Sequence, residues 1–305
     1  MRTTFMKLTV ALLVAGIFAP AARADGGPSP GVTFDARGIS NRASPLTYVS
    51  EAAGNLSNLN IRDRSETVVR TRTFDGLYGI PLVTYGGDRG GLSRDGRTLV
   101  VARAPEGGAG LAAVSRFLVL DTRTLRTRRV IDLDGDFSFD ALSPDARMLY
   151  LIQHSSARDY ERYRVRAYDL SSGRLLPNAI VDKTEPDMRG TPMARLVGPG
   201  GRWVYTFYVH QGGESFVHAL DTVRAQARCL DIEWHGNQRA LWWAHLELTG
   251  DRLALVSNHG KRLAELDLQT PSASGFGVGW LGAIAALVLA ATGVAAWSRR
   301  RARHA

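Results

Sequence analysis

Residues 142 to 154 read LSPDARMLYLIQH and join a tight turn to a short apolar strand. Ser-Pro-Asp suits the turn, because proline holds φ near its turn value and the polar side chains bond nearby backbone amides. The LYLI run that follows is continuously apolar, as strands buried on both faces are. The stretch therefore predicts a buried strand entered through a tight turn, and the chain repeats it.

The repeat keeps one period at two independent markers. The first is an arginine between a turn and an apolar strand, with spacings of 50, 55 and 50 residues, at Arg97, Arg147, Arg202 and Arg252. The second is an aspartate ending another apolar strand, with spacings of 48, 52 and 46 residues, at Asp121, Asp169, Asp221 and Asp267. Short strands joined by Gly, Pro and Asp turns at this period are typical of propeller blades.

A degraded fifth copy begins upstream, where GISNRASPLTYVS at 38–50 parallels the later turns and strands. The sequence thus predicts an all-β fold, a β-propeller of about five four-stranded repeats, the last one lacking its outer strand. The expected repeats span 32–76, 77–135, 136–186, 187–234 and 235–270. Either a small five-bladed ring closes imperfectly, or the array stays open and pairs with another chain as a homo-oligomer. We expect the repeat aspartates to cap the turns that follow them.

The two ends of the chain predict export and anchoring. Residues 1–24 combine a basic start, a short apolar core and the small-residue end Ala-Arg-Ala, which is typical of a secretory signal peptide. Residues 276–297 form an uncharged apolar run long enough for a transmembrane helix, and the arginine-rich tail at 298–305 marks the cytoplasmic side. With linkers at 25–31 and 271–275, we expect an extracytoplasmic domain over 32–270 in a single-pass protein of a bacterial plasma membrane.

The net charge argues against nucleic-acid binding, and the cysteine content argues against an internal disulfide. The formal net charge is +9, but the signal segment and the tail carry seven of these positive charges, so about +2 remains for the exterior domain. This charge is too small to predict nucleic-acid binding. Cys229 is the only cysteine, so no internal disulfide forms, and its apolar context predicts a buried, inert thiol.

Through LSPDARMLYLI and FLVLDTRT, the chain resembles the bacterial YVTN-type and TolB-like relatives of WD40 repeats over residues 32 to 270. The resemblance implies a propeller. The group of proteins that the chain resembles includes both binding scaffolds and lactonase-like or lyase-like enzymes. Many of these relatives have six or seven blades, whereas this chain carries about five repeats. The difference puts ring closure in doubt.

The loops after each second strand, and those between repeats, are expected to gather on one face, where binding residues usually lie. Candidate ligand-binding residues on this face are His154, Arg158, Tyr160, Glu185, Asp187, Arg189, His210, Trp234, His235 and His259. His154, His210 and His259 follow their repeat arginines by seven, eight and seven residues. A metal site is disfavoured, because second strands of neighbouring blades lie roughly 10 Å apart.

Three further candidates have competing interpretations. Asp187 and Arg189 would orient a polar ligand, or they form an ion pair within a solvated loop. Trp234 would belong to an aromatic platform for sugars, or to the core. Glu185 and Asp187 are two nearby carboxylates, as in a glycoside hydrolase, but no third element accompanies them.

The sequence favours a membrane-anchored, non-enzymatic recognition or scaffold module for an envelope protein, a peptide or a glycan. No cofactor is expected. The alternative is an extracytoplasmic propeller enzyme, lactonase-like or lyase-like, with its site on the loop face. A membrane-coupled sensor is disfavoured by the short tail at 298–305.

Overall fold

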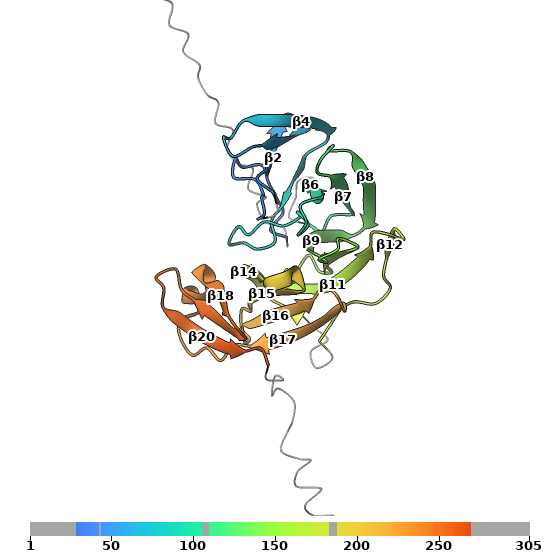
Figure 1. The fold of residues 1–305 in the computed structure, drawn as a ribbon. Helices are drawn as coiled ribbons and strands as arrows, with labels where there is room; N and C mark the ends of the chain where they lie inside the picture. The colour runs from blue at the N-terminus through green and yellow to red at the C-terminus, as the bar shows by residue number, and fades with distance from the viewer. Residues whose placement is uncertain (1–28, 43, 106–109, 183–187, 270–305) are drawn as a thin grey trace, which may run out of the picture.

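The computed structural model describes residues 29–42, 44–105, 110–182 and 188–269. This part of the chain is all-β, and its antiparallel sheets follow one another along an arc, as the blades of a propeller do (Figure 1). Two short 3-10 helices interrupt the strands, η1 (Pro199–Gly201) and η2 (Gln238–Trp243). No helix within the described residues has the length and apolarity needed to cross a membrane. The predicted signal peptide and transmembrane span lie outside them.

Five sheets are formed by the described residues. The first comprises β2 (Thr47–Ala53), β3 (Leu56–Arg62) and β4 (Val68–Asp75), and the second β1 (Val32–Thr33), β5 (Tyr78–Pro81), β6 (Thr98–Arg103), β7 (Val114–Asp121) and β8 (Thr127–Asp134). The third comprises β9 (Asp136–Leu142), β10 (Met148–His154), β11 (Arg162–Asp169), β12 (Arg174–Leu175) and β13 (Met188–Arg189). The fourth comprises β14 (Thr191–Val197), β15 (Trp203–Val209), β16 (Phe216–Asp221) and β17 (Gln226–Asp231), and the fifth β18 (His245–Thr249), β19 (Arg252–Val256) and β20 (Arg262–Asp267).

The end repeats differ from the predicted four-stranded pattern. Within the described residues, which end at 269, the fifth sheet has three strands. The first sheet also has three, because its innermost strand is reduced to the single bridge between Ile39 and Tyr48. Strand β1 was assigned to the first repeat by the sequence, and this was wrong: Val32 and Thr33 pair with β5 of the second sheet.

Apolar runs are buried on both faces because each lies between two sheets. In β10, Leu149 and Leu151 pack in the core shared with the second sheet, whereas Tyr150 and Ile152 pack in the core shared with the fourth. Side chains of a strand alternate between its faces, so a strand flanked on both sides must be apolar at every position. The LYLI run has this pattern for that reason.

The two periodic markers of the sequence meet in space. In the second to fourth sheets, the backbone carbonyl of the repeat arginine accepts a bond from the residue after the repeat aspartate, as in Leu170 N to Arg147 O at 2.8 Å. The aspartates cap the next turn, as predicted: Asp121 accepts from Thr124 N, and Asp169 from Ser171 N. We call this end of the sheets the turn face, and the opposite end, which carries His154 and η2, the loop face.

Candidate functional site

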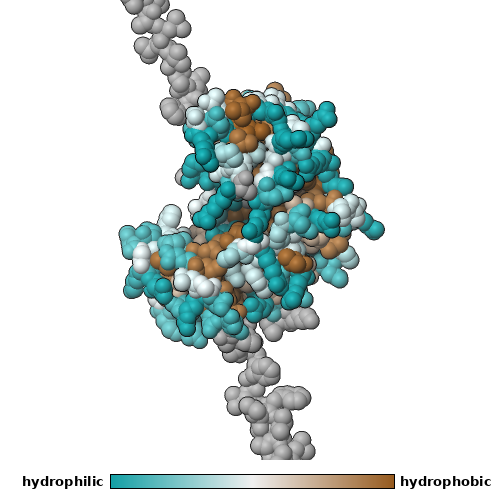
Figure 2. Space-filling model, viewed as in Figure 1, coloured by the Kyte–Doolittle hydropathy of each residue, from teal (hydrophilic) through white to brown (hydrophobic). Residues whose placement is uncertain are grey.

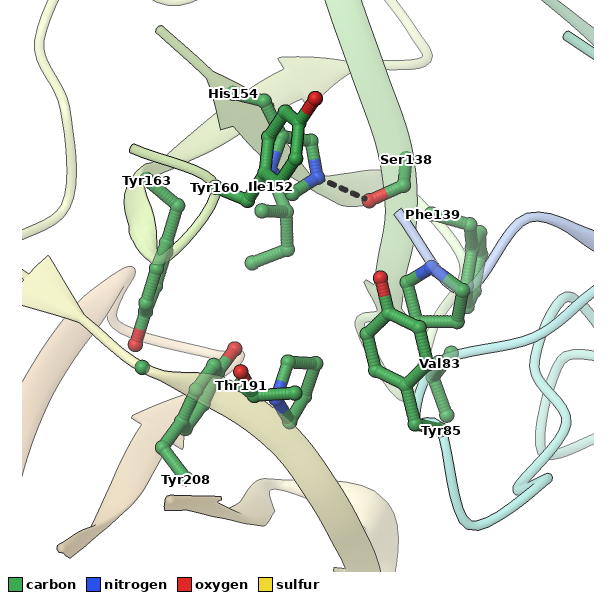
Figure 3. A pocket seen from close by; sticks show the side chains of 13 residues that line it. Val83, Tyr85, Ser138, Phe139, Ile152, His154, Tyr160, Tyr163, Thr191 and Tyr208 are labelled. Carbon is green, nitrogen blue, oxygen red and sulfur yellow. Dashed lines mark hydrogen bonds between the residues drawn. The ribbon is translucent and has the colours of Figure 1, made fainter. Parts of the chain in front are cut away.

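A small pocket, with a cavity volume of about 40 Å3 and partly open to solvent, lies on the loop face where the second, third and fourth sheets meet (Figure 3). Strand β10 ends there with Ile152 and His154, and β9 contributes Ser138 and Phe139 beside them. The opposite wall comes from the fourth sheet. The other lining residues are Pro30, Val83, Tyr85, Tyr160, Tyr163, Gly190, Thr191, Pro192 and Tyr208.

Two tyrosines form the buried floor of the pocket. Tyr163 and Tyr208 stack with ring centroids 4.8 Å apart, and Tyr208 stacks in turn on Phe216 at 5.3 Å. Burial raises the pKa of both phenols, so they are uncharged at neutral pH. Two more tyrosines stand at the mouth, where Tyr85 and Tyr160 remain 48% and 41% exposed. The pocket is therefore an aromatic recess with a fixed floor and an accessible rim.

His154 is buried in the pocket wall. Burial lowers its pKa to about 4, so the imidazole is neutral at pH 7. Its Nε2 lies 3.4 Å from Ser138 Oγ, and its Nδ1 has no hydrogen-bond partner among the described residues. A general base works best with a pKa near the working pH and an acceptor that orients its second nitrogen. The Ser138–His154 pair therefore makes a poor nucleophile and base.

The mouth of the pocket is held by the loop between β10 and β11. Glu161 accepts a bond from Gly190 N through its carbonyl and from Gln211 N through its carboxylate, at 2.9 and 3.1 Å. The same carboxylate lies 3.7 Å from His210 Nε2. Two residues earlier in the loop, Asp159 pairs with Arg189 at 3.2 Å. These contacts fix the loop against the fourth sheet and place Tyr160 at the rim.

The structure brings together some of the residues that the sequence singled out. His154 and Tyr160 line this pocket, Arg189 and His210 contact Asp159 and Glu161 of the loop at its mouth, and Arg158 lies exposed on the same loop. Arg189 pairs with Asp159 on the loop between β10 and β11. Glu185 and Asp187 lie outside the described residues.

The remaining candidates are elsewhere. Trp234 packs against the core between the fourth and fifth sheets, and His235 and His259 are exposed beyond it. The histidine register thus does not converge, and no group of three or more His, Cys, Asp or Glu side chains in the described chain is arranged to hold a metal.

Sequence reasoning missed the segment that closes the pocket. Residues 82–90, which we call the brace hairpin, leave the second sheet after β5 and reach the fourth, where Tyr85 N donates to Pro192 O at 2.9 Å. The signal was a length difference. From the first residue of the innermost strand to the repeat arginine there are 19 residues in the second repeat, Tyr78 to Arg97, but 11 in the third, Asp136 to Arg147.

Comparisons with known proteins give fold likenesses alone. No family model matches the chain, and no curated protein matches it. Among solved structures, TolB from Acinetobacter baumannii is similar at 13% identity and a TM-score of 0.40, over 75% of this chain and 53% of that one. A putative TolB from Agrobacterium tumefaciens gives 16% and 0.42, over 73% and 67%.

The Cps50 (Swd1) β-propeller domain of Myceliophteria thermophila gives 13% identity and a TM-score of 0.41, over 72% of this chain and 62% of that one. The chain thus spans about half to two thirds of the length of these structures. At such TM-scores the likenesses carry no argument, so the fold rests on the sheets and cores of the chain itself.

Proposed function

We propose that this protein is a non-enzymatic recognition module, anchored at the bacterial plasma membrane by its C-terminal segment, whose tyrosine pocket captures part of an envelope protein or peptide. The observation that carries the proposal is the pocket itself: four tyrosines converge on one recess at the junction of three sheets. Rigid aromatic side chains with polar tips are the residues that dominate protein recognition sites.

The lining favours a peptide segment over a glycan. Among the described residues no charged side chain lines the pocket, and apart from the tyrosines the polar side chains that line it are Ser138, His154 and Thr191. A sugar ring would bury several hydroxyls against a lining that is largely aromatic and aliphatic, and each hydroxyl left without a partner would cost about 1–3 kcal/mol. An apolar side chain of a peptide would bury none.

Cross-linking and pull-down from intact cells test the proposal. We expect wild type to capture a saturable envelope partner, and a Tyr85→Ala, Tyr160→Ala variant to lose it, because both rings at the mouth are removed. Trp243→Ala is the matched control, since this aromatic residue is 73% exposed and lies outside the pocket. A partner captured equally well by both variants would exclude the pocket as the site.

The enzyme alternative has its own readout. A lactone or glycoside panel should give no turnover that depends on Ser138 or His154. Turnover that disappears in Ser138→Ala, while the melting temperature stays unchanged, would instead make the Ser138–His154 pair catalytic.

A further inference from the structure

The turn face presents a broad array of arginines. At least one exposed arginine stands on the turns of every sheet, because each repeat begins its second strand with one and several third turns add another. The exposed arginines on these turns include Arg42, Arg94, Arg97, Arg123, Arg126, Arg147, Arg174, Arg224 and Arg252. The Arg147 side chain, for example, is 78% exposed.

These turns lie side by side across the sheets. Asn41 Nδ2 donates to Ser93 O at 2.7 Å, which joins the turns of the first and second sheets. Arg94 of the second sheet lies against Gly200 and Gly201 of the fourth, and Gly201 also approaches Pro144 of the third. The arginines therefore belong to one continuous surface.

The aspartates of the same turns bond their own backbone, and Asp145, which is 61% exposed, also lies 3.8 Å from Arg147. Asp145 Oδ1 accepts from Ser143 Oγ at 2.6 Å and from Arg147 N at 3.1 Å. Asp221 Oδ1 likewise accepts from Val223 N and Arg224 N. A short carboxylate bonded to its own turn lies close to the protein, whereas an arginine extends its charge outward on a long stem. The guanidinium groups can therefore reach beyond these carboxylates toward an approaching surface.

Two apolar side chains stand among these arginines. Val197 ends β14 and Val223 forms the tip of the turn between β16 and β17, and they are 59% and 62% exposed. Exposed apolar side chains surrounded by basic residues are typical of surfaces that dock at a membrane interface.

The described chain also leaves the domain on this face. Leu268 N donates to Asp251 O at 2.9 Å, and Gln269 Nε2 donates to Asp251 Oδ2 at 2.6 Å. The expected transmembrane span begins at residue 276, seven residues after Gln269. At about 3.5 Å per residue, this segment reaches about 25 Å at most.

We propose that the turn face docks on anionic lipid headgroups at the surface of the membrane that anchors the chain, so that the tyrosine pocket points away from the bilayer. The arginines, the two valines and the exit of the chain all fall on this one face. Strand β10 separates Arg147 from His154 by seven residues, or about 20 Å, so the pocket stands clear of the lipid. This proposal rests on the predicted anchor but not on the ligand of the pocket.

Fluorescence quenching in lipid nanodiscs tests the docking with the full chain. A dye is attached at Val223→Cys on the turn face or at Trp243→Cys on the loop face, since the native Cys229 is buried. Quenching by a headgroup-labelled lipid should be several-fold stronger at position 223. It should be stronger in discs that contain phosphatidylglycerol than in pure phosphatidylcholine discs, and it should weaken at high salt.

Charge variants make the test specific. Arg97→Gln, Arg147→Gln and Arg224→Gln combined should remove the lipid dependence, whereas Arg158→Gln, Arg164→Gln and Arg239→Gln combined, exposed arginines on or near the loop face, should leave it unchanged. Equal effects of the two triple variants would overturn the proposal. Equal or stronger quenching at position 243 would also overturn it.

Two further arms separate the lipid from other causes. Soluble glycerol phosphate should not displace the turn face from the lipid surface. Displacement would show that the arginines bind a free anion instead. If the chain does not insert into discs, flotation with phosphatidylglycerol vesicles replaces the disc assay. Salt-sensitive flotation lost in the turn-face triple variant would support docking without the anchor, and absence of flotation would overturn docking.

Discussion

Buried histidines shape the response of this protein to pH. His218 lies in the fourth sheet with its ring edge-on to Tyr208 at 6.4 Å, and neither ring nitrogen has a hydrogen-bond partner among the described residues. Burial lowers its pKa to about 4, with opposing charge effects from Asp140 and Asp182, which raise it, and from Arg195, which lowers it further. His154 shares this low pKa.

We therefore predict that stability falls as the pH drops from about 6.5 to about 4. In this window the unfolded chain binds protons at both histidines and the folded chain does not, so protonation favours unfolding. Each histidine contributes on the order of 3 kcal/mol over the window. Urea unfolding at several pH values should show a shallower fall for His218→Leu than for wild type. His259→Leu, at an exposed position, should match wild type; an unchanged slope in His218→Leu would contradict the assignment.

A buried ion pair joins the third and fourth sheets. Arg195 on β14 contacts Asp140 on β9 at 2.7 Å, and the two side chains are 7% and 5% exposed. Neither charge has water to replace its partner. The pair thus constrains how the two sheets meet.

Removal of one partner should be costly. We expect Arg195→Met to destabilise the protein by about 3–5 kcal/mol, because it leaves the Asp140 carboxylate buried and unpaired. The double variant Asp140→Leu, Arg195→Met should recover most of the loss. Arg116→Met, which breaks the exposed pair with Asp132, should cost less than about 1 kcal/mol in the same denaturation assay. A double variant no more stable than Arg195→Met would argue against this account.

Among the elements, the brace hairpin links more of the fold than its length suggests. Thr84 Oγ1 donates to Asp88 Oδ2 at 2.8 Å, which closes the hairpin turn. Arg89 pairs with Asp35 just after β1, while Gly86 packs against Met193 O and Gly90 against the Phe139 ring. The hairpin therefore connects the N-terminal segment with three sheets and supplies one wall of the pocket.

A methyl group at the tip should detach the hairpin. A Cβ at residue 86 would lie 2.3 Å from Met193 O, a backbone atom, so Gly86→Ala must push the tip away from β14. We expect faster amide exchange at Tyr85 by hydrogen–deuterium exchange and weaker partner capture. Gly110→Ala is the control, because a Cβ there meets nothing within 4 Å and its φ is not positive. Wild-type protection in Gly86→Ala would contradict the contact.

At the scale of the whole molecule, the described chain forms an open array. Its five sheets share four hydrophobic cores, one between each pair of consecutive sheets. A closed ring would need a fifth core between the first and last sheets. Figure 1 shows these two sheets at the ends of the arc, and the surface in Figure 2 is hollowed between them.

Both end sheets carry polar side-chain pairs on their outer faces, and the first sheet also exposes Leu56, Val68 and Val69 at 41%, 47% and 54%. On the first, Thr71 bonds Asn60 and Thr73 bonds Asn58, each at 2.7 Å. On the last, Arg252 and His245 pair with glutamates on neighbouring positions of the same face. Repeat arrays end in this way when their terminal units act as soluble caps. The polar faces disfavour the expected pairing of open rings between copies.

We accordingly predict that the full chain is monomeric in detergent by analytical ultracentrifugation. Asn58→Leu with Thr73→Leu should replace a satisfied polar pair by an exposed apolar patch and produce association that increases with concentration. The same substitutions on another exposed cross-strand pair, Arg116→Leu with Asp132→Leu, control for non-specific association through exposed apolar surface. A wild-type dimer would show that the polar end faces pair after all.

The repeat, the strands and the role of the turns follow from the amino-acid sequence alone. These features are local: a turn needs Pro, Gly or Asp where it bends, and a strand between two sheets needs apolar residues throughout, as in LYLI at 149–152. Both constraints act within a few residues and recur with each blade. The turn and strand positions can therefore be predicted from the sequence around Arg147 and Asp169 without any knowledge of the fold.

Whether the ring closes, and how the pocket forms, depend on tertiary contacts. Strand β1 joined the second sheet, and Tyr85 reached the fourth sheet through the brace hairpin, because each found its backbone partners far away in sequence. No periodicity records such pairings. Tyr163 and Tyr208 became a pocket floor only by stacking across two sheets. The first and last sheets meet only if the whole array curves far enough. That curvature is a property of all five sheets together, and no single repeat encodes it.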